Sequence, residues 1–173
     1  MQPQFEPQQS VARSRDALGS LIDDLAKAIA GMSTGDRAEL RRGTPDDPGS
    51  PAFWKLAVTH LAPRGFVDLQ DASLATLGRW VVILGALAEL EGLHNPRARL
   101  GRALAEAGYS ELRLTRLLRA EGNQLLDAVR QAVHFLASKG AEVDVAEMAR
   151  LVLSNSVRVR RAIASHYYAA QES

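Results

Sequence analysis

Arginine side chains gather in four short segments of the chain, and this residue type suits one kind of chemistry, the binding of phosphate. Of the 21 basic residues, 18 are arginine. A planar guanidinium donates paired hydrogen bonds to a phosphate, which the point charge of lysine cannot do. Because a high-GC genome also enriches arginine, the number of these residues says less than their positions do. The four segments are GDRAELRRG (35–43), PRARLGRAL (96–104), SELRLTRLLRA (110–120) and VRVRRA (157–162).

The segment 110–120 gives the clearest signal for an anionic partner. Arg113, Arg116 and Arg119 recur every three residues, which places them in a slowly drifting stripe along about two turns of helix. Position 117, where an acidic partner for Arg113 would stand, is leucine. Like charges at this spacing repel by roughly a few tenths of a kcal/mol in an isolated helix. The stability of the helix itself therefore does not explain the stripe. Binding to a phosphate backbone would explain it, because the phosphates offset the repulsion.

The other arginine segments are also predicted to present charge on helix faces. Arg158, Arg160 and Arg161 open the predicted final helix, where positive charge opposes the helix dipole. For the first segment, an ordinary surface helix with a Glu39–Arg42 ion pair is the alternative. The remaining arginines that we assign to a nucleic-acid-binding surface are Arg37, Arg41, Arg42, Arg99 and Arg102.

Residues typical of enzymes are not arranged for catalysis in this sequence. The chain has no GxxxxGK[ST] phosphate loop, no GxGxxG segment after a strand and no GxSxG nucleophile elbow. No histidine has a carboxylate or a second histidine at metal-ligand spacing, and cysteine is absent. We therefore expect no catalytic activity, no metal, no cofactor and no small-molecule substrate. The histidines, predicted to be surface or capping residues, are His60, His94, His134 and His166.

The elements that must position these side chains are helices. Apolar residues recur at helical spacing, as in residues 18–29. Apolar and polar residues alternate only in short segments such as GFVDL, which are too short for a sheet. The segment 71–91 is apolar nearly all round, which predicts the buried centre of a bundle. Asp144 and Glu147 form a D-x-x-E pattern that predicts a capped helix start. The predicted helices cover approximately residues 10–30, 34–42, 51–61, 71–91, 97–107, 110–121, 123–139, 144–155 and 157–170.

These helices predict an all-α fold of two packed helical bundles, with about eight to nine helices and no significant sheet. Residues 1–9 are expected to form a disordered tail, residues 10–94 the N-terminal bundle and residues 95–173 the C-terminal bundle. The boundary falls at GLHNP (92–96), where a glycine follows a helix end and a proline comes shortly after it.

Composition limits the class of protein further. Apolar residues make up 46% of the chain, enough for a core, and no apolar run approaches the roughly 20 residues of a membrane-spanning helix. The segment MQPQFEPQQS has no signal-peptide pattern, so we expect a cytoplasmic protein without membrane contact. Residues 1–95 hold 9 basic and 12 acidic side chains, whereas residues 96–173 hold 12 basic and 8 acidic ones. Positive charge is therefore concentrated in the second half.

Five segments, in this order along the chain, match one known family: GDRAELRRG (35–43), SPAFWKL (50–56), LGRALAEAGYSELRLTRLLRA (100–120), VDVAEMARLVL (143–153) and VRVRRAIASHYY (157–168). Together they resemble CasB, the small subunit of the type I-E CRISPR surveillance complex, Cascade. The segment 100–120 is the most specific part, and the resemblance covers most of the chain from residue 35 onward. It implies an α-helical protein of two bundles that has no catalytic activity.

The resemblance also implies a role in antiviral defence. Such subunits lie as a pair of copies along Cascade, help to hold the crRNA-bearing backbone, and stabilise the R-loop by binding the displaced non-target strand. The implied partners are crRNA, target DNA, other Cascade subunits and a second copy of the chain. Their contacts would go to phosphate regardless of base identity, while guide pairing supplies the sequence choice. The basic residues that match the family are Arg41, Arg42, Lys55, Arg102, Arg113, Arg119, Arg130, Arg158 and Arg160.

Two other functions fit part of the sequence. A purely structural scaffold subunit would pair its arginines with acidic patches on neighbouring proteins and would show no salt-dependent affinity for nucleic acid. A helix-turn-helix regulator would use the segment 110–120 as its recognition helix, but the stripe lacks the Asn, Gln or Ser expected to read base edges. The scaffold ranks second. With 5% aromatic residues, mostly expected in the core, a dedicated stacking platform for single strands is not expected.

Overall fold

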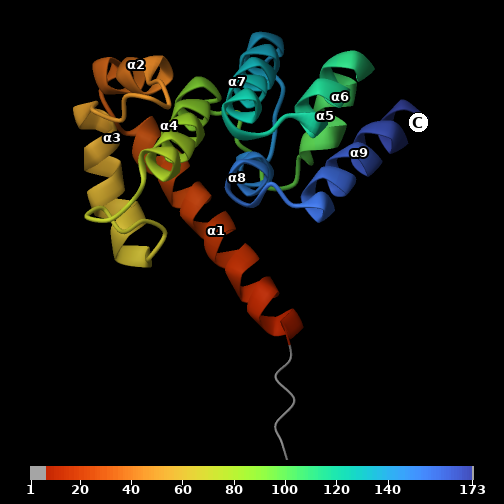
Figure 1. Cartoon of the computed structure of the whole chain (residues 1–173). Helices are drawn as coiled ribbons and strands as arrows, with labels where there is room; N and C mark the ends of the chain where they lie inside the picture. Colours follow the sequence, from red (N-terminus) through yellow and green to blue (C-terminus); the bar gives the residue numbers. More distant parts are fainter. Residues whose placement is uncertain (1–6, 173) are drawn as a thin grey trace, which may run out of the picture.

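The computed structural model describes residues 7–172, with side chains from residue 17 onward. Within this part of the chain, the only β-type pairings are two isolated bridges, Thr44 with Asp47 and His94 with Val143. The all-α prediction is confirmed (Figure 1). The α-helices are α1 (Pro7–Ala30), α2 (Thr34–Arg42), α3 (Pro51–Leu56), α4 (Leu74–Glu89), α5 (Leu100–Glu106), α6 (Glu111–Arg119), α7 (Gly122–Lys139), α8 (Val145–Ser154) and α9 (Val157–Gln171).

Serine caps explain why many of these helices begin where they do. In each case the serine hydroxyl accepts a hydrogen bond from the backbone amide three residues later, which satisfies an amide that the helix itself leaves unpaired. These bonds are local in sequence, so the predicted starts agree with the observed ones to within a few residues. The capping serines are Ser33, Ser50, Ser73, Ser110 and Ser156.

Two helix boundaries differ from the predictions. Helix α1 begins at Pro7, so residues 7–9, expected in the disordered tail, are helical, while residues 1–6 lie outside the described part. Proline suits the first turn of a helix because its missing N–H is not needed there. Helix α3 was expected to continue as one α-helix, but Ala57–Leu61 forms a π-helical turn and Ala62–Arg64 a 3₁₀ turn.

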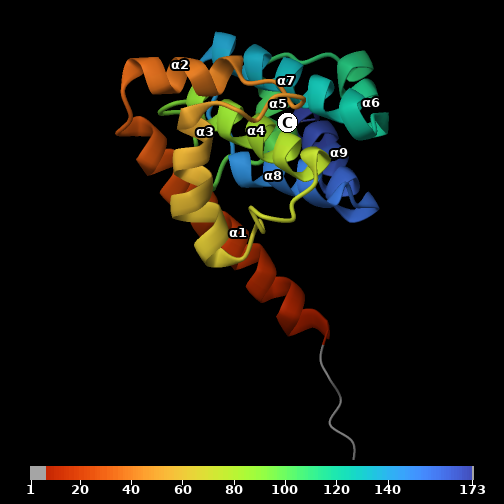
Figure 2. The same ribbon diagram turned by 60° about the vertical axis from the view of Figure 1, so that its left-hand side comes forward.

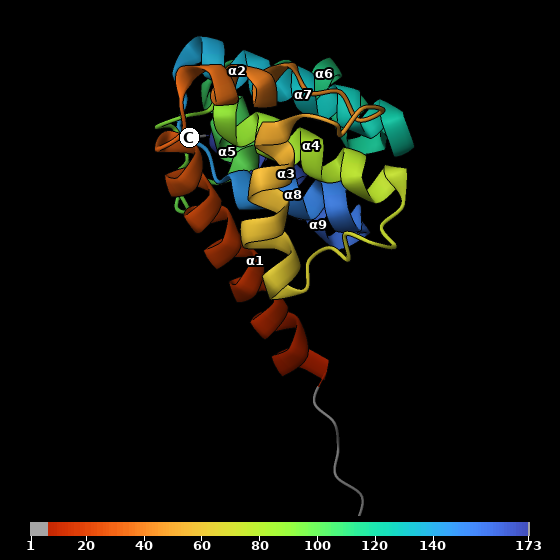
Figure 3. The ribbon, with the colours of Figure 1, turned by 90° about the vertical axis from the view of Figure 1, so that its left-hand side faces the viewer.

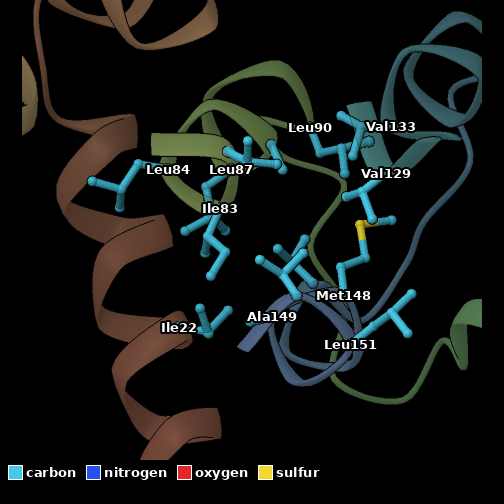
Figure 4. Packing of buried hydrophobic residues seen from close by; sticks show 14 of the residues in the cluster. Ile22, Ile83, Leu84, Leu87, Leu90, Val129, Val133, Met148, Ala149 and Leu151 are labelled. Carbon is cyan, nitrogen blue, oxygen red and sulfur yellow. The ribbon is translucent and has the colours of Figure 1, made fainter. Parts of the chain in front are cut away.

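Helix α4 is the centre of the molecule, as its apolar sequence predicted. Trp80 is 1% exposed and Leu84 is fully buried, and α1, α2, α7 and α8 pack around the helix. Figure 4 shows Ile22 of α1, Ile83 of α4 and Met148 of α8 in the same apolar cluster. The described residues thus share one core that continues across the predicted boundary at 92–96, and the division into two bundles stays a prediction.

The connection between α4 and α5 is held by buried and partly buried polar contacts. The backbone amide of Val145 donates to Nδ1 of His94, 3.2 Å away, so the imidazole carries its proton on Nε2, which lies 2.7 Å from Asp23 Oδ1. The predicted capped start of α8 is confirmed at Asp144, but Glu147 does not take part in this cap. Asp144 accepts from the Ala146 amide, whereas Glu147 Oε2 accepts from the Leu100 amide at 2.6 Å and caps α5 instead.

Helices α2, α6 and α7 form one side of the molecule. These three helices lie along the same side of the molecule in three views (Figures 1, 2 and 3). Helix α5 packs closely on α9, where a Cβ at Gly101 would clash with the Ile163 carbonyl oxygen. The arginine-rich segments therefore lie on helices whose positions are fixed by packing.

Candidate nucleic-acid interface

A groove of about 530 Å³ lies between α2, α4 and α7, with the start of α6 at its side. The side chains of three predicted arginines line it, each from a different helix: Arg41 of α2, Arg113 of α6 and Arg130 of α7. They are 17 to 89 residues apart in the chain, so packing alone brings them together. We call this feature the α2–α7 groove.

The arginines of the α2–α7 groove are available to an anion. Within residues 17–172, Arg41 and Arg130 make no ion pair or side-chain hydrogen bond, and Arg41 and Arg113 are exposed. The groove also contains Glu89, whose carboxylate lies 2.8 Å from Nδ1 of His134. One carboxylate against three guanidinium groups leaves the groove positively charged, which attracts a polyanion.

Aromatic rings hold Arg113 in place beside the groove. Its guanidinium carbon lies 5.9 Å from the centroid of the Tyr109 ring and 5.7 Å from that of the Phe135 ring. Both distances are within the range of a cation–π interaction. Tyr109 is buried, and burial raises the pKa of its phenol, an effect that the charge of Arg113 opposes. The phenol therefore stays neutral near pH 7.

The stripe on α6 extends this positive charge away from the groove. Arg116 and Arg119 are exposed and make no ion pair within the part of the chain whose side chains are described. Leu114 and Leu117, each 1% exposed, bury the opposite face of α6. The predicted stripe is therefore confirmed as a solvent-facing row that has no acidic partner among these residues.

Two of the predicted binding residues are instead built into the fold. Arg37 donates through Nη1 to the carbonyl oxygens of Ala30 and Met32, both at 3.0 Å, and its Nε lies 3.2 Å from Glu91 Oε2. Arg160 donates to the carbonyl oxygen of Ala120 at 3.1 Å and also to an asparagine side chain. Their side chains are 19% and 21% exposed, so both groups serve mainly to join segments of the protein.

Three other predicted residues lie at the surface with acidic partners. Arg102 Nε lies 2.6 Å from Glu106 Oε1, Lys55 Nζ lies 3.6 Å from a carboxylate oxygen of Asp36, and Arg99 bonds to Glu147. The exposed pairs of Arg102 and Lys55 contribute roughly 0–1 kcal/mol and exchange partners readily, whereas Arg99 is paired with the buried carboxylate of Glu147. These residues remain able to meet an anion, but they lie outside the α2–α7 groove.

The last predicted residues are spread over other parts of the surface. Arg42 lines a shallow depression beside the loop 43–51. Arg158 lines a second groove with Arg99 between α8 and α9, and Arg161 is exposed on α9. The structure therefore does not gather all the predicted arginines into one patch.

Sequence reasoning missed several residues of the α2–α7 groove. Gln131, His134 and Phe135 line it from α7. His134 stands four residues after Arg130, so the two share a helix face, and this spacing is the one signal that could have linked them. Among the side chains described from residue 17 to 172, no three His, Cys, Asp or Glu could hold a metal ion, and no helix of the described residues has the length and apolar character to cross a membrane.

Comparison with known proteins places this architecture in a family. The structure is similar to a chain in the crystal structure of E. coli Cascade bound to a PAM-containing double-stranded DNA target, with a TM-score of 0.66 and 21% sequence identity. The match covers 86% of this chain and 95% of that chain, whereas no curated protein matches. The family described as CRISPR-associated protein Cse2 matches residues 36–168. In agreement with the resemblance to CasB, the chain belongs to the CRISPR-associated protein Cse2 family.

Proposed function

We propose that the protein is a non-catalytic small subunit of a type I-E CRISPR surveillance ribonucleoprotein, Cascade, that grips nucleic-acid backbone through the α2–α7 groove and the α6 stripe. The observation that carries this proposal is the convergence of Arg41, Arg113 and Arg130 from three helices on one groove. Arginines without acidic partners among the described residues, placed together by packing, form a positively charged site whose charge the fold does not neutralise. A phosphate backbone supplies the missing negative charge.

The expected binding is independent of base sequence. Guanidinium groups on phosphate fix position and add affinity, but they carry no information about the bases. In the proposed complex, the subunit stabilises the R-loop by holding the displaced non-target strand, while the guide RNA selects the sequence. The partners are then crRNA, target DNA, other Cascade subunits and a second copy of the chain, in the cytoplasm. Support for this setting comes from the similar chain, which was solved within E. coli Cascade bound to its DNA target.

A scaffold subunit with protein-only contacts is the second candidate. Large apolar side chains on the surface are compatible with it, because protein interfaces use exposed apolar patches. Leu112 and Val157 are each 62% exposed, and Tyr168 is 44% exposed. Such contacts are compatible with nucleic-acid binding elsewhere on the same protein, so the two functions differ mainly in what the arginines do.

Fluorescence anisotropy with labelled oligonucleotides of unrelated sequence, single-stranded and duplex, tests the proposal. The purified protein is expected to bind them at low salt with similar affinity for different sequences, and to lose affinity steeply as salt rises. Absence of binding at low salt would instead favour the scaffold. A strong preference for one sequence would contradict binding through phosphate alone.

A further inference from the structure

The floor of the α2–α7 groove is apolar, which phosphate binding does not require. Val82 and Ala86 of α4 and Val133 of α7 are buried and line it, and the partly buried ring of Phe135 stands at its side. Its volume, about 530 Å³, falls in the range of about 300–1,000 Å³ that is typical of small-molecule sites. Phosphates would reach only the arginines at the rim and leave this floor empty.

The groove also offers flat surfaces. The partly buried ring of Phe135 meets the buried ring of Tyr109 edge to face, with centroids 5.1 Å apart, and the Arg113 guanidinium and the Lys139 ammonium each lie 5.7 Å from the Phe135 centroid. Nucleobases stack on aromatic rings and on guanidinium planes. Gln131, on the same wall, is exposed and has amide groups that suit the edge of a base.

We infer that the α2–α7 groove holds an unpaired nucleobase against Phe135 and Arg113 while the flanking phosphates bind Arg41 and Arg130. This inference rests on the proposed function, because it assumes that a nucleic-acid strand reaches the groove. It adds one stacking contact to a protein in which the sequence predicts no dedicated stacking platform for single strands. Charge complementarity selects the occupant, since an apolar floor beneath three guanidinium groups matches an apolar base carried by an anionic backbone. The contact is one base subsite, and stacking tolerates any base.

An abasic oligonucleotide separates this inference from the proposed function. The probes are a single-stranded oligodeoxynucleotide of mixed sequence and one of equal length built from abasic tetrahydrofuran residues, which has the same number of phosphates. Because the abasic strand has no base to occupy the single stacking subsite, it is expected to bind roughly tenfold more weakly at the same salt. Equal affinities would overturn the base subsite and leave the backbone grip standing. If neither strand binds, the proposed function and this inference both fail.

A substitution at Phe135 tests whether the difference in affinity between the two strands arises in the α2–α7 groove. Phe135→Leu removes the aromatic face and keeps an apolar side chain, so the tenfold gap between the two strands should shrink. Phe66→Leu is the matched control, because Phe66 packs edge to face against Trp80, 5.9 Å between centroids, and does not line the groove. This control should retain the full gap. A gap that Phe135→Leu leaves unchanged in a folded protein would place the base contact elsewhere and overturn the assignment.

Discussion

The guanidinium of Arg113 lies over the ring of Phe135, 5.7 Å from its centroid, and this contact joins α6 to α7 at the side of the α2–α7 groove. An arginine on an exposed helix normally samples many rotamers, and ordering them weakens binding by about 0.5–1.5 kcal/mol per side chain. Because the rings already restrict Arg113, much of that ordering precedes binding. The same contact therefore stabilises the protein and orders Arg113 for the proposed interface.

Structural arginines should be separable from binding arginines by their effect on stability. Arg37→Ala and Arg160→Ala each remove hydrogen bonds to backbone carbonyls, so each should lower the free energy of unfolding by about 1–3 kcal/mol. Urea unfolding measures this loss. Neither change should alter the salt dependence of nucleic-acid binding. A reduced salt slope in a variant of unchanged stability would place that arginine in the interface after all.

Glu147 should matter to stability far more than a surface carboxylate does. Its side chain is 10% exposed and accepts a hydrogen bond from the Leu100 amide at the start of α5. Glu147→Ala leaves this buried amide without an acceptor and should lower the free energy of unfolding by about 1–3 kcal/mol. Glu147→Gln keeps an acceptor oxygen and should recover part of the loss. The control is Glu106→Ala, which breaks an exposed i,i+4 pair and should cost no more than about 0.5 kcal/mol. Similar melting temperatures for Glu147→Ala and the control would contradict the buried cap.

The burial of α4 and α6 gives a direct test of the core. Trp80 and Leu117 are each 1% exposed, so their replacement by alanine should lower the free energy of unfolding by roughly 2–5 kcal/mol. Leu112→Ala, at a position 62% exposed on the same helix as Leu117, should change it by no more than about 0.5 kcal/mol. Chemical denaturation distinguishes the two classes. Equal effects at positions 112 and 117 would contradict the assignment of a buried and an exposed face to α6.

The stability of the protein should depend on pH through Asp144. Burial, opposed by the hydrogen bond from the Ala146 amide, raises the pKa of this carboxyl. A carboxyl with a higher pKa in the folded state binds its proton more readily there, so ionisation weakens the fold as pH rises from the unfolded pKa to the folded one. Asp144→Asn keeps an N-cap acceptor and avoids this loss.

The Asn variant should therefore compare more favourably with the original protein at about pH 7 than at about pH 3, where the aspartate is itself protonated. Unfolding in urea at both pH values measures the difference. Asp127→Asn, at an exposed position, should show no such pH-dependent gain. A constant difference for Asp144→Asn would contradict a penalty for ionising this buried carboxyl.

Local features of the fold could be predicted from the sequence. Helix starts at Ser33, Ser50 and Ser156 depend on bonds to residues three positions away, which a sequence pattern contains. The link between Asp23 and His94 spans 71 residues, and no pattern contains it. The π-helical turn at Ala57–Leu61 also escaped prediction, because its composition continues the helical pattern of α3 without a break.

The sequence predicts the candidate binding residues from their type and spacing. Only the structure shows which of them are used within the fold and which line the groove. Arg37 and Arg41 share a face of α2, yet Arg37 meets the end of α1 while Arg41 lines the α2–α7 groove. Arg130 was expected only from the resemblance to CasB. Its nearness to Arg41 depends on how α2 and α7 both pack on α4. Phe135 could not be distinguished in the sequence from a core residue of α7.

Arginines of the α2–α7 groove are proposed to contact phosphates, and the salt dependence of single-strand binding measures these contacts most directly. The double change Arg41→Ala with Arg130→Ala should lower the slope of log K against log salt by roughly 1.4, about 0.7 for each lost contact. The double change Arg79→Ala with Arg97→Ala removes the same charge at exposed positions outside the groove. This control should leave the slope unchanged. Equal slopes for the two double variants would contradict a binding site in the groove.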